Sequence, residues 1–394
     1  MSDILPDHID LSFFDRVIPR RGTDSIKWDT TPEDVLPMWV ADMDFACPPA
    51  VTSALQERLT HPVLGYTRIP RSYRDAVTRW IAERHRLGSA ADEASITVCP
   101  GVMPSIRTAI DAFTVEGDSI VLQPPVYFPF YDAISSKKRR TVRNALVRGE
   151  DGYRMDLDHL EQCFAQDRPA MMLLCSPHNP VARVWSTSEL EALLSLCERY
   201  GVTLVSDEIH GDIVYAPQRF VSVASIRTDA RTVVCNAPSK TFNIAGLGHS
   251  FVLTRDAQDT RVFRRALSQA GMDHPHVLGM VAAEAAYRWG EQWLDTMLVY
   301  LSENISHMRS RLKSELPDLG MLPMQGTFIS WLDLSAYGSE ADFLPRISRY
   351  LRLNAGTDFG PEGEGYMRLN VATSRSVLDE GIDRLVKALS DPGT

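Results

Sequence analysis

The sequence predicts an α/β fold, in which helices cover a mostly parallel seven-stranded β-sheet and a smaller α+β domain follows. Short runs of β-branched and apolar residues recur along the middle of the chain, and stretches with helical periodicity separate several of them. Strands that alternate with helices are typical of a parallel sheet with helices on both faces. The chain shows no internal repeat and no low-complexity tract.

The expected elements run from an irregular N-terminal arm to a helix-rich C-terminal part. The arm, residues 1–45, is rich in Pro, Asp and aromatic residues. We assign it to the small domain, with residues 46–285 as the large domain and 286–394 as the rest of the small one. Strands are expected at 95–99, 119–123, 140–146, 170–175, 202–206, 232–235, 250–254, 327–332 and 366–371. Helices are expected at 50–59, 71–85, 101–113, 156–165, 188–200 and, as one long pattern, 275–316.

The composition argues against nucleic-acid, membrane and metal partners. The net charge is −10, and the one basic cluster, residues 137–140, is expected to cap a helix or edge a strand rather than to form a basic face for nucleic acid. No apolar run approaches the roughly 20 residues of a membrane span, and the N-terminus lacks the features of a signal peptide. The six cysteines form no CxxC pair and the ten histidines show no ligand spacing, so we expect no metal and a cytoplasmic location.

Lysine is scarce, and one of the six lysines stands apart. Five of them lie beside charged residues or on an amphipathic helix, as solvated lysines do, whereas no other charged residue lies between Arg231 and Arg255 around Lys240. A cation in so apolar a stretch must find a partner, or lower its pKa and lose its charge. An uncharged lysine is a nucleophile that can form a Schiff base. A lysine that reaches solvent from a strand end fits the same segment.

Polar residues follow two of the expected strands. Asp207 comes directly after 202–206, and Asn179 follows 170–175 within the sequence Ser-Pro-His-Asn-Pro. In open α/β sheets, ligands bind outside the carboxyl ends of the strands. A carboxylate there can pair with the ring nitrogen of a pyridine cofactor, and an amide can donate to a phenolate oxygen. An Asp that caps the next helix and an ordinary Asn-Pro turn are the structural alternatives.

Two further segments extend this candidate site. Gly101 and Val102 follow the strand at 95–99 and open a helix, whose free backbone N–H groups suit a phosphate. Tyr127 ends another strand and could stack on an aromatic ring, although a core tyrosine fits the same position. Together these signals place an amine, an acid, an amide, an aromatic ring and a phosphate seat at the ends of consecutive strands.

These residues resemble fold-type I enzymes that depend on pyridoxal 5′-phosphate (PLP), which share the aspartate aminotransferase-like fold. Within them the chain is most similar to the cystathionine β-lyase group typified by the MalY and PatB proteins. The order and spacing of the matching stretches cover nearly the whole chain, and those around Lys240 and at 37–45 (Pro-Met-Trp-Val-Ala-Asp-Met-Asp-Phe) are highly specific to this group. The other stretches are 65–67, 100–102, 124–130, 176–181, 206–210, 237–246 and 359–370.

The resemblance implies PLP as the cofactor and a role for each matching residue. Lys240 would carry PLP as a Schiff base, Asp207 would pair with the ring nitrogen, Asn179 would bond the ring hydroxyl and Tyr127 would stack on the ring. Tyr66 would reach the phosphate in the neighbouring subunit, so we expect a homodimer and count Lys240, Asp207 and Tyr66 as catalytic. Further cofactor contacts are expected from Gly101, Val102, Met103, Ser239 and His210. Substrate contacts are expected from Trp39, Val40, Phe128, Asn179 and, as a clamp on the carboxylate, Arg368.

Two positions depart from common patterns. The group commonly has Gly where Ala182 stands, and Ala is strained if the backbone there needs a positive φ. Many aminotransferases of this fold have a phosphate-binding Arg eight residues after the lysine, where this chain has Gly248. The second departure agrees with the lyase group.

The expected activity is β-elimination from cystathionine or a related S-substituted L-cysteine, which yields a thiol, pyruvate and ammonia. Lys240 would remove the Cα proton, a general-base contribution worth ~10²–10⁴-fold in rate. An aminotransferase acting on a small amino acid would use the same Lys, Asp and Asn. A PLP-binding regulatory protein with little turnover is the alternative from another class.

Overall fold

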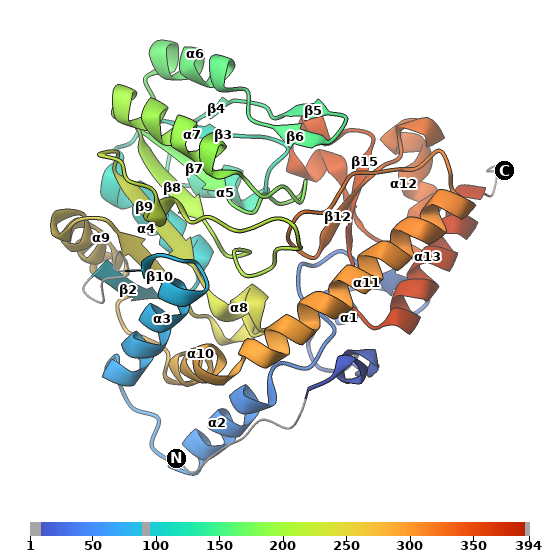
Figure 1. The fold of residues 1–394 in the computed structure, drawn as a ribbon, viewed down its shortest axis with the longest axis horizontal. Coiled ribbons are helices and arrows are strands. Elements are labelled where there is room, and N and C mark those ends of the chain that lie inside the picture. Colours follow the sequence, from blue (N-terminus) through green and yellow to red (C-terminus); the bar gives the residue numbers. More distant parts are fainter. Residues whose placement is uncertain (1–8, 89–94, 391–394) are drawn as a thin grey trace.

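The computed structural model describes residues 9–88 and 95–390 of the 394-residue chain. In Figure 1 the large sheet and its helices occupy the left of the molecule, and a smaller sheet lies to the right. The long helix α11 (Glu291–Glu315) runs diagonally from the first region to the second. None of the described helices is long and apolar enough to span a membrane.

The large sheet has seven strands in the order β2-β10-β9-β8-β7-β3-β4. Every neighbouring pair is parallel except those of β10, which runs antiparallel to both β9 and β2. The predicted mostly parallel sheet is therefore confirmed. The strands are β2 (Ile96–Cys99), β3 (Ser119–Leu122), β4 (Arg140–Arg143), β7 (Met171–Cys175), β8 (Thr203–Asp207), β9 (Thr232–Asn236) and β10 (Ser250–Thr254).

The direction of β10 follows from the short connection that precedes it. A parallel return needs a crossover that spans the sheet, usually a helix. Between β9 and β10 the chain forms only the four-residue helix α8 (Pro238–Thr241) and a short 3₁₀ turn. The chain therefore re-enters the sheet at the end where it left, and Lys240 lies on this connection.

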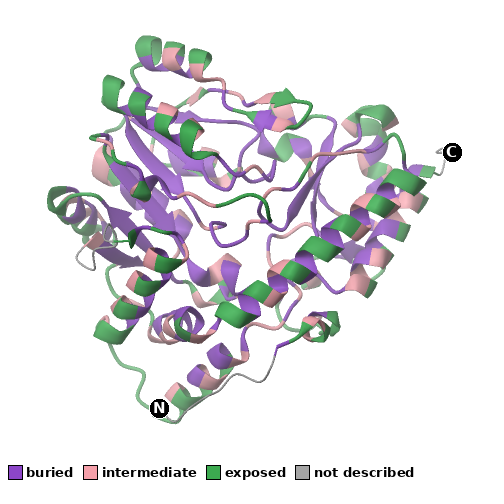
Figure 2. Cartoon of the chain, in the orientation of Figure 1, coloured by how far each residue is buried: buried purple, intermediate pink, exposed green. Residues whose placement is uncertain are grey.

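Helices cover both faces of the large sheet, and its central strands are buried along their whole length. Figure 2 shows these strands buried and the helices exposed on their outer sides. Several helices have capping residues at their ends. Helix α7, for example, begins with a capping box formed by Ser186 and Glu189 and ends at Gly201, which has a left-handed conformation. The helices of this part of the chain are α2 (Pro49–Leu59), which packs on α10, and α3 (Arg71–Glu83), α4 (Val102–Phe113), α5 (Pro129–Ser135), α6 (Leu157–Asp167), α7 (Thr187–Tyr200), α9 (Ala257–Gln269) and α10 (Val277–Trp289).

The smaller sheet is antiparallel, in the order β11-β12-β15-β14. Its strands are β11 (Gly320–Met321), β12 (Ile329–Asp333), β14 (Asn354–Ala355) and β15 (Tyr366–Asn370), and it packs with α11, α12 (Glu340–Ser348) and α13 (Arg375–Ser390). Arg368 lies on β15, opposite Trp331 of β12 and Asn354 of β14.

The N-terminal arm contains more structure than its composition predicts. It forms a 3₁₀ turn (Leu11–Asp15), the short helix α1 (Ile26–Asp29) and β1 (Leu36–Pro37), which pairs in parallel with β13 (Leu351–Arg352). Lys27 on α1 is 1% exposed, so the expectation that it is solvated is wrong. Its Nζ lies 2.7 Å from Oδ2 of Asp44, a partner far along the chain that local sequence does not reveal.

The single helix predicted over 275–316 is also wrong, since the structure has α10 and α11 with Gly290 between them. A Cβ at Gly290 would lie 2.5 Å from the Ala286 carbonyl oxygen and 2.6 Å from a ring carbon of Phe242. Helices α5, α9, α12 and α13 and the hairpin of β5 (Val147–Gly149) and β6 (Gly152–Arg154) were not predicted.

Candidate active site

A pocket of about 250 Å³ lies at the carboxyl ends of β2, β7, β8 and β9. This is the edge of the sheet at which the sequence predicts a site. Nine of the predicted residues line it: Gly101, Val102, Met103, Tyr127, Asn179, Asp207, His210, Ser239 and Lys240.

Lys240 projects from α8, directly after β9. Its Nζ donates a hydrogen bond of 2.5 Å to the backbone carbonyl of Ala41 in the N-terminal arm. Burial lowers the pKa of Lys240 to about 8, against the attraction of Asp42 and Asp207 and with the repulsion of Arg368. Lys240 thus has a hydrogen-bond acceptor in Ala41 and also a lowered pKa. These are the two outcomes that its apolar segment predicts.

Asp207 is the last residue of β8 and faces the same pocket. Its Oδ1 accepts a hydrogen bond of 3.1 Å from the backbone N–H of Ile209. Burial raises the pKa of Asp207 to about 7, and Lys240 opposes that rise. A cationic group bound in the pocket beside this carboxylate would stabilise its ionised form.

Glu208, the next residue along the chain, does not line the pocket. It is fully buried and accepts hydrogen bonds from Ser206 Oγ at 3.1 Å and from the backbone N–H of Val223 at 3.0 Å. Burial raises the pKa of Glu208 to about 7. Its contacts tie the end of β8 to a neighbouring loop.

Asn179 lines the pocket, and Arg368 lies behind it and is linked to the pocket through Asn179. Arg368 donates from Nη1 to Asn179 Oδ1 at 3.2 Å, and from Nη2 to Asn354 Oδ1 at 2.7 Å and to the Trp39 carbonyl at 2.8 Å. Because the Asn179 oxygen is used in this way, its NH₂ group remains to donate to a ligand. Burial lowers the pKa of Arg368 to about 10, so it stays charged at neutral pH.

Arg368 has the properties of a carboxylate receptor. It is 3% exposed, it lies 4.8 Å above the ring of Phe359, and its Nε is buried without a partner among the described residues. The hydrogen-bond acceptors around it are neutral amides and carbonyls. A substrate carboxylate would supply the negative charge that these acceptors lack.

The start of α4 forms one end of the pocket. Gly101 has φ +144°, which L side chains rarely adopt, and its N–H already donates to Ser250 Oγ at 3.1 Å. Pro104 has no N–H, so Val102 and Met103 carry the free donors of this first turn. Ser239 on α8 lines the same pocket.

Tyr127 and His210 contribute rings to the pocket. Tyr127 packs against Phe128 and Phe130, and burial raises its pKa. His210 packs edge-on against Phe328, and its Nδ1 is buried without a partner in the described part of the chain. Burial lowers the pKa of His210 to about 3, so the imidazole is neutral.

Five predicted site residues are not part of the pocket lining, namely Arg368, described above, and Tyr66, Phe128, Trp39 and Val40. Tyr66 is 96% exposed, beside the ring of His274. Phe128 is 37% exposed and contacts Tyr127 and Phe359. Trp39 and Val40 reach the site through backbone carbonyls, which accept hydrogen bonds from Arg368 and Asn370 respectively.

Sequence reasoning missed Ala41 and Cys175, which both line the pocket. Cys175 ends β7, and its Sγ accepts a hydrogen bond of 3.4 Å from the backbone N–H of Asn179. Its place at a strand end is a signal that could have identified it. Ala41 contributes its backbone carbonyl oxygen. Every residue type has this atom, so the sequence gives no signal for it.

The fold and this pocket define the class of protein. The chain belongs to the family of class I and II aminotransferases, whose model matches residues 33–385. Within the family it is 41% identical to cystathionine β-lyase PatB of Bacillus subtilis, over 87% of this chain and 95% of that protein. It is 33% identical to the protein MalY of Escherichia coli, over 82% of this chain and 83% of that protein. The structure of a PLP-bound C-S lyase from Staphylococcus hominis matches with a TM-score of 0.89 and 28% identity, over 95% of this chain and 98% of that one. The resemblance noted from the sequence is confirmed.

Proposed function

We propose that this chain is a PLP-dependent carbon–sulfur β-lyase, which converts cystathionine or a related S-substituted L-cysteine to a thiol, pyruvate and ammonia. The observation that carries the proposal is the convergence of Lys240 and Asp207 on one pocket, with Arg368 linked to it through Asn179. The similarity to PatB and to the Staphylococcus hominis C-S lyase supports the reaction class and a sulfur-containing amino acid as substrate.

The residues of the pocket fit PLP. When bound, PLP supplies an aldehyde that condenses with amines and a pyridine ring that accepts electrons from the substrate Cα. Two features support this fit: the buried His210 Nδ1 has no partner among the described residues, and no side chain caps the start of α4. Lys240 would hold the aldehyde, Asp207 the ring nitrogen, Asn179 the ring hydroxyl and Tyr127 the ring face, with Val102, Met103 and Ser239 at the phosphate.

The reacting groups of the chain divide the work between binding and proton transfer. Arg368 binds and orients the substrate carboxylate. With a pKa of about 8, Lys240 is present in both protonation states near neutral pH, so its Nζ can take the proton from Cα and hold it. The Ala41 carbonyl then accepts a hydrogen bond from the resulting ammonium. The charge of Asp207 would keep the ring nitrogen of bound PLP protonated.

The presence of glycine at position 248 supports the assignment of a lyase over that of an aminotransferase. The residue has φ +52°, and its Cα supplies no side chain to the pocket that it lines. Many aminotransferases of this fold carry a phosphate-binding arginine there, so its absence agrees with the lyase relatives. The family also contains aminotransferases. Whether turnover requires a keto-acid acceptor therefore distinguishes an aminotransferase from a lyase.

The test is incubation of the purified protein with PLP and L-cystathionine in the absence of any keto acid. We expect pyruvate and thiol in equal amounts, and a loss of at least ~10²-fold in rate for Lys240→Ala. Turnover that requires a keto-acid acceptor would indicate an aminotransferase. Bound PLP without turnover on a panel of S-substituted cysteines would indicate a regulatory protein.

We further propose that the protein works as a homodimer, with Tyr66 completing the site of the partner subunit. Tyr66 is exposed, and the same stretch exposes Leu59, Val63 and Leu64 by 52% or more. Apolar side chains gathered on a surface are typical of an interaction site. Sedimentation equilibrium should give the mass of two chains, and a monomer at micromolar concentration would contradict the proposal.

A cytoplasmic location is the last part of the proposal. All six cysteines are free thiols in the structure, and five of them are buried. Free thiols persist where the compartment is reducing. Fractionation of cells that produce the protein should recover it with cytoplasmic markers.

A further inference from the structure

A short piece of the N-terminal arm, residues 39–43, covers Lys240 and Arg368, and we name it the roof segment. All five of its backbone carbonyls accept hydrogen bonds from side chains elsewhere in the chain. The acceptor and donor pairs are Trp39 with Arg368, Val40 with Asn370, Ala41 with Lys240, Asp42 with Asn370 and Lys27, and Met43 with Asn243 and Arg20. Carbonyl oxygens carry partial negative charge, so this segment places negative poles against the two cations of the site.

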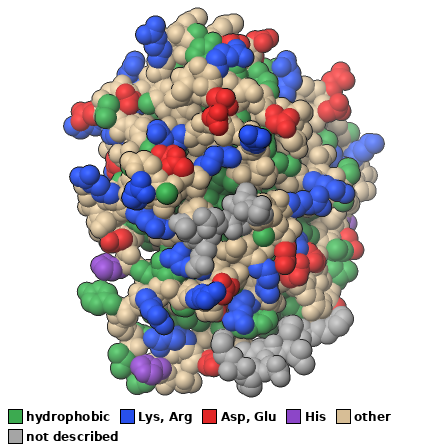
Figure 3. Space-filling model, turned by 60° about the vertical axis from the view of Figure 1, so that its left-hand side comes forward, with side chains coloured by type: hydrophobic (Ala, Val, Ile, Leu, Met, Phe, Trp, Pro, Cys, Tyr) green, Lys and Arg blue, Asp and Glu red, His purple; other side chains and the backbone are tan. Residues whose placement is uncertain are grey.

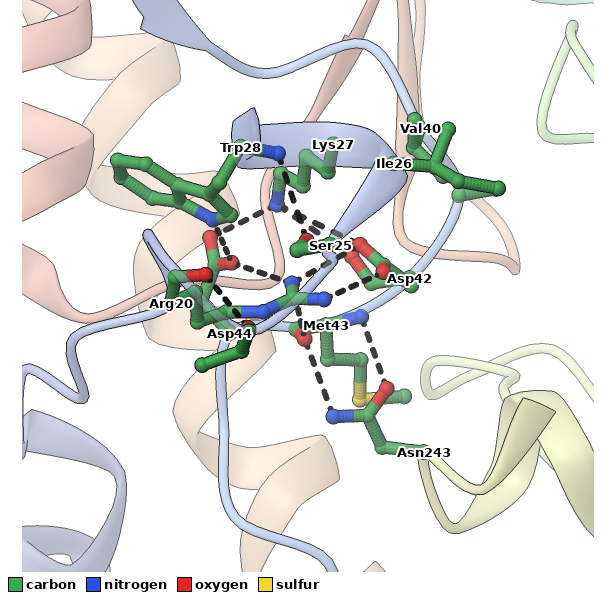
Figure 4. Close-up of polar contacts among 12 residues, drawn as sticks. Arg20, Ser25, Ile26, Lys27, Trp28, Val40, Asp42, Met43, Asp44 and Asn243 are labelled. Atoms are coloured by element: carbon green, nitrogen blue, oxygen red, sulfur yellow. Dashed lines mark hydrogen bonds and ion pairs between the residues drawn. The ribbon is translucent and has the colours of Figure 1, made fainter. Parts of the chain in front are cut away.

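Four charged side chains form a cluster beside the roof segment, and we name Arg20, Lys27, Asp42 and Asp44 the arm cluster. Asp42 belongs to the roof segment itself, and Asp44 follows its last residue. Arg20 donates to Asp42 Oδ2 at 2.7 Å and to Asp44 Oδ1 at 2.8 Å. Lys27 donates to Asp44 Oδ2 at 2.7 Å and lies 3.9 Å from Asp42 Oδ1. Figure 4 shows Arg20 and Lys27 directed toward the two carboxylates, with Asn243 holding Met43 on the opposite side.

The arm cluster depends on each of its charges because it is largely buried. Lys27 is 1% exposed and the Asp44 side chain 10%. Burial opposes the ionisation of Asp44, but the charge and hydrogen bond of Lys27, with hydrogen bonds from Trp28 and Arg20, hold its pKa below its ordinary value. Removal of one partner from such a pair leaves an uncompensated buried charge. Removal of the Lys27 charge therefore leaves the carboxylates of Asp42 and Asp44 less compensated. These two residues lie on either side of Met43, the last residue of the roof segment.

We propose that Lys27 is a positioning residue for the reaction: through Asp44 and Asp42 it holds the roof segment closed over Lys240 and Arg368. The proposal rests on the proposed function in taking Lys240 as the reacting amine. Lys27 itself touches neither the pocket nor Lys240. Its contribution is the placement of the carbonyls of Trp39 and Ala41.

The position of the roof segment sets how readily Lys240 loses its proton. The charged and titratable groups that face Lys240 are Asp42 from the arm, Asp207 and His210 from the end of β8, and Arg368 from β15. Burial is the largest influence among them and lowers the Lys240 pKa. A loosened roof admits water, which relieves the burial that lowers the pKa of Lys240, so the pKa rises. Water also weakens the attraction of Asp42, which offsets part of this rise, but burial is the larger influence.

The experiment compares Lys27→Met with Lys313→Met, which removes an exposed lysine of α11. Acetylation of Lys240 is followed by mass spectrometry against pH in the full-length protein after removal of PLP. The parent and Lys313→Met should show a midpoint near pH 8. Lys27→Met should shift it upward by about one unit, since burial effects on lysine reach several units. With PLP restored, kcat near pH 8 should fall by up to about tenfold, because one pKa unit is a tenfold change in proton binding.

A second variant covers the case in which Lys27→Met does not fold. Arg20 is 21% exposed, so Arg20→Met removes contacts to Asp42, Met43 and Asp44 at a less buried position, and it should shift the midpoint in the same direction. An unchanged Lys240 midpoint in a folded variant would overturn the proposal. The midpoint is read without substrate or PLP, so it decides the role of Lys27 even if the parent released no pyruvate.

Discussion

Ala182 occupies a backbone conformation that favours glycine. Its φ is +56°, in the left-handed region, which costs an L residue roughly 1–2 kcal/mol. Its N–H donates to the His178 carbonyl at 2.8 Å, and its own carbonyl accepts from Gln325 and Gly326, so the loop that carries Asn179 is fixed in this shape. The sequence predicts strain at Ala182 if its φ is positive, and φ is positive here, so the strain is present.

We predict that Ala182→Gly changes the free energy of unfolding by less than about 1 kcal/mol. Relief of the left-handed strain is offset by the loss of a buried methyl group, about 0.8 kcal/mol, and by the backbone entropy of Gly, about 0.5–1 kcal/mol. The matched control is Ala283→Gly, equally buried but within α10, where no strain is relieved. It should cost about 2 kcal/mol in urea unfolding. Equal losses in the two variants would show that Ala182 is unstrained.

Asp207 should make the stability of the PLP-free protein depend on pH. Burial raises its pKa from 3.8 to about 7, so the folded chain holds a proton that the unfolded chain releases between these values. The stability that this proton confers is lost as the pH rises from about 4 to 7. Asp207→Asn should therefore gain stability over the parent across this range, by up to about 1.4 kcal/mol per pH unit, and level off above it. Glu208 titrates in the same range but is common to both proteins.

The measurement is urea unfolding of both PLP-free proteins at pH 5, 6, 7 and 8, with protein concentration held constant. A constant difference between the two would show that Asp207 is ionised throughout. Addition of PLP should reverse the order at pH 8, because a protonated ring nitrogen pairs with the carboxylate and not with the amide.

Site residues that follow strands could be predicted, and those that act across the chain could not. Lys240 and Asn179 each follow a strand of the large sheet and Asp207 ends one, so strand order alone brings them together. Lys27 has Asp24 and Asp29 as near neighbours in the sequence, which makes it look solvated, yet its partner Asp44 is 17 residues away. Long-range pairing of this kind leaves no local pattern.

At the scale of elements, the break between α10 and α11 should be sensitive to a single methyl group. Gly290 lies against Phe242, two residues after Lys240, and a Cβ there would be 2.6 Å from the ring. Gly290→Ala should therefore lower the free energy of unfolding by about 1–3 kcal/mol through overpacking. The control is Gly246→Ala, which meets no atom within 4 Å and has no positive φ. Thermal unfolding of the two variants tests the prediction, and similar melting temperatures would contradict it.

The elements that could be predicted are those whose own residues carry the signal. The buried strand β7 is a continuous apolar run, and β8 has Leu204 and Val205 at its centre; both were located to within a residue. Helix α12 contains Pro345, which argues against a helix in the sequence, and the β5–β6 hairpin has strands of only three residues. Gly290, between α10 and α11, lies against Phe242, which is distant in the chain, so the periodicity of the local sequence does not reveal this contact.

At the scale of the whole molecule, we propose the division into an arm (1–45), a large domain (46–285) and a C-terminal part (286–394), the arm belonging with the last. The pairing of β1 with β13 and the contact of Tyr300 on α11 with Asp15 support this grouping. Limited proteolysis should release the large domain before it separates the arm from the C-terminal part. Early loss of the arm alone would contradict the grouping.

The charges on one face of the molecule are mixed in sign (Figure 3). On the face shown in Figure 3, basic and acidic side chains lie interspersed over the surface. The net charge of the whole chain is −10. Nucleic-acid binding depends on the neutralisation of phosphates by a basic surface, and this face offers no such field.

The proposed dimer makes a prediction that no single chain can satisfy. Lys240→Ala and Tyr66→Ala should each be inactive alone, since each homodimer lacks one group in both sites. If Tyr66 acts on the partner subunit, a mixed dimer has one site with Lys240 from one chain and Tyr66 from the other. Random exchange makes half of the dimers mixed, each with one intact site, so activity should recover to about a quarter of the parent's. Pyruvate release after mild unfolding and refolding of the mixture measures this, and no recovery from well-folded mixed dimers would place Tyr66 on its own subunit's site or outside the chemistry.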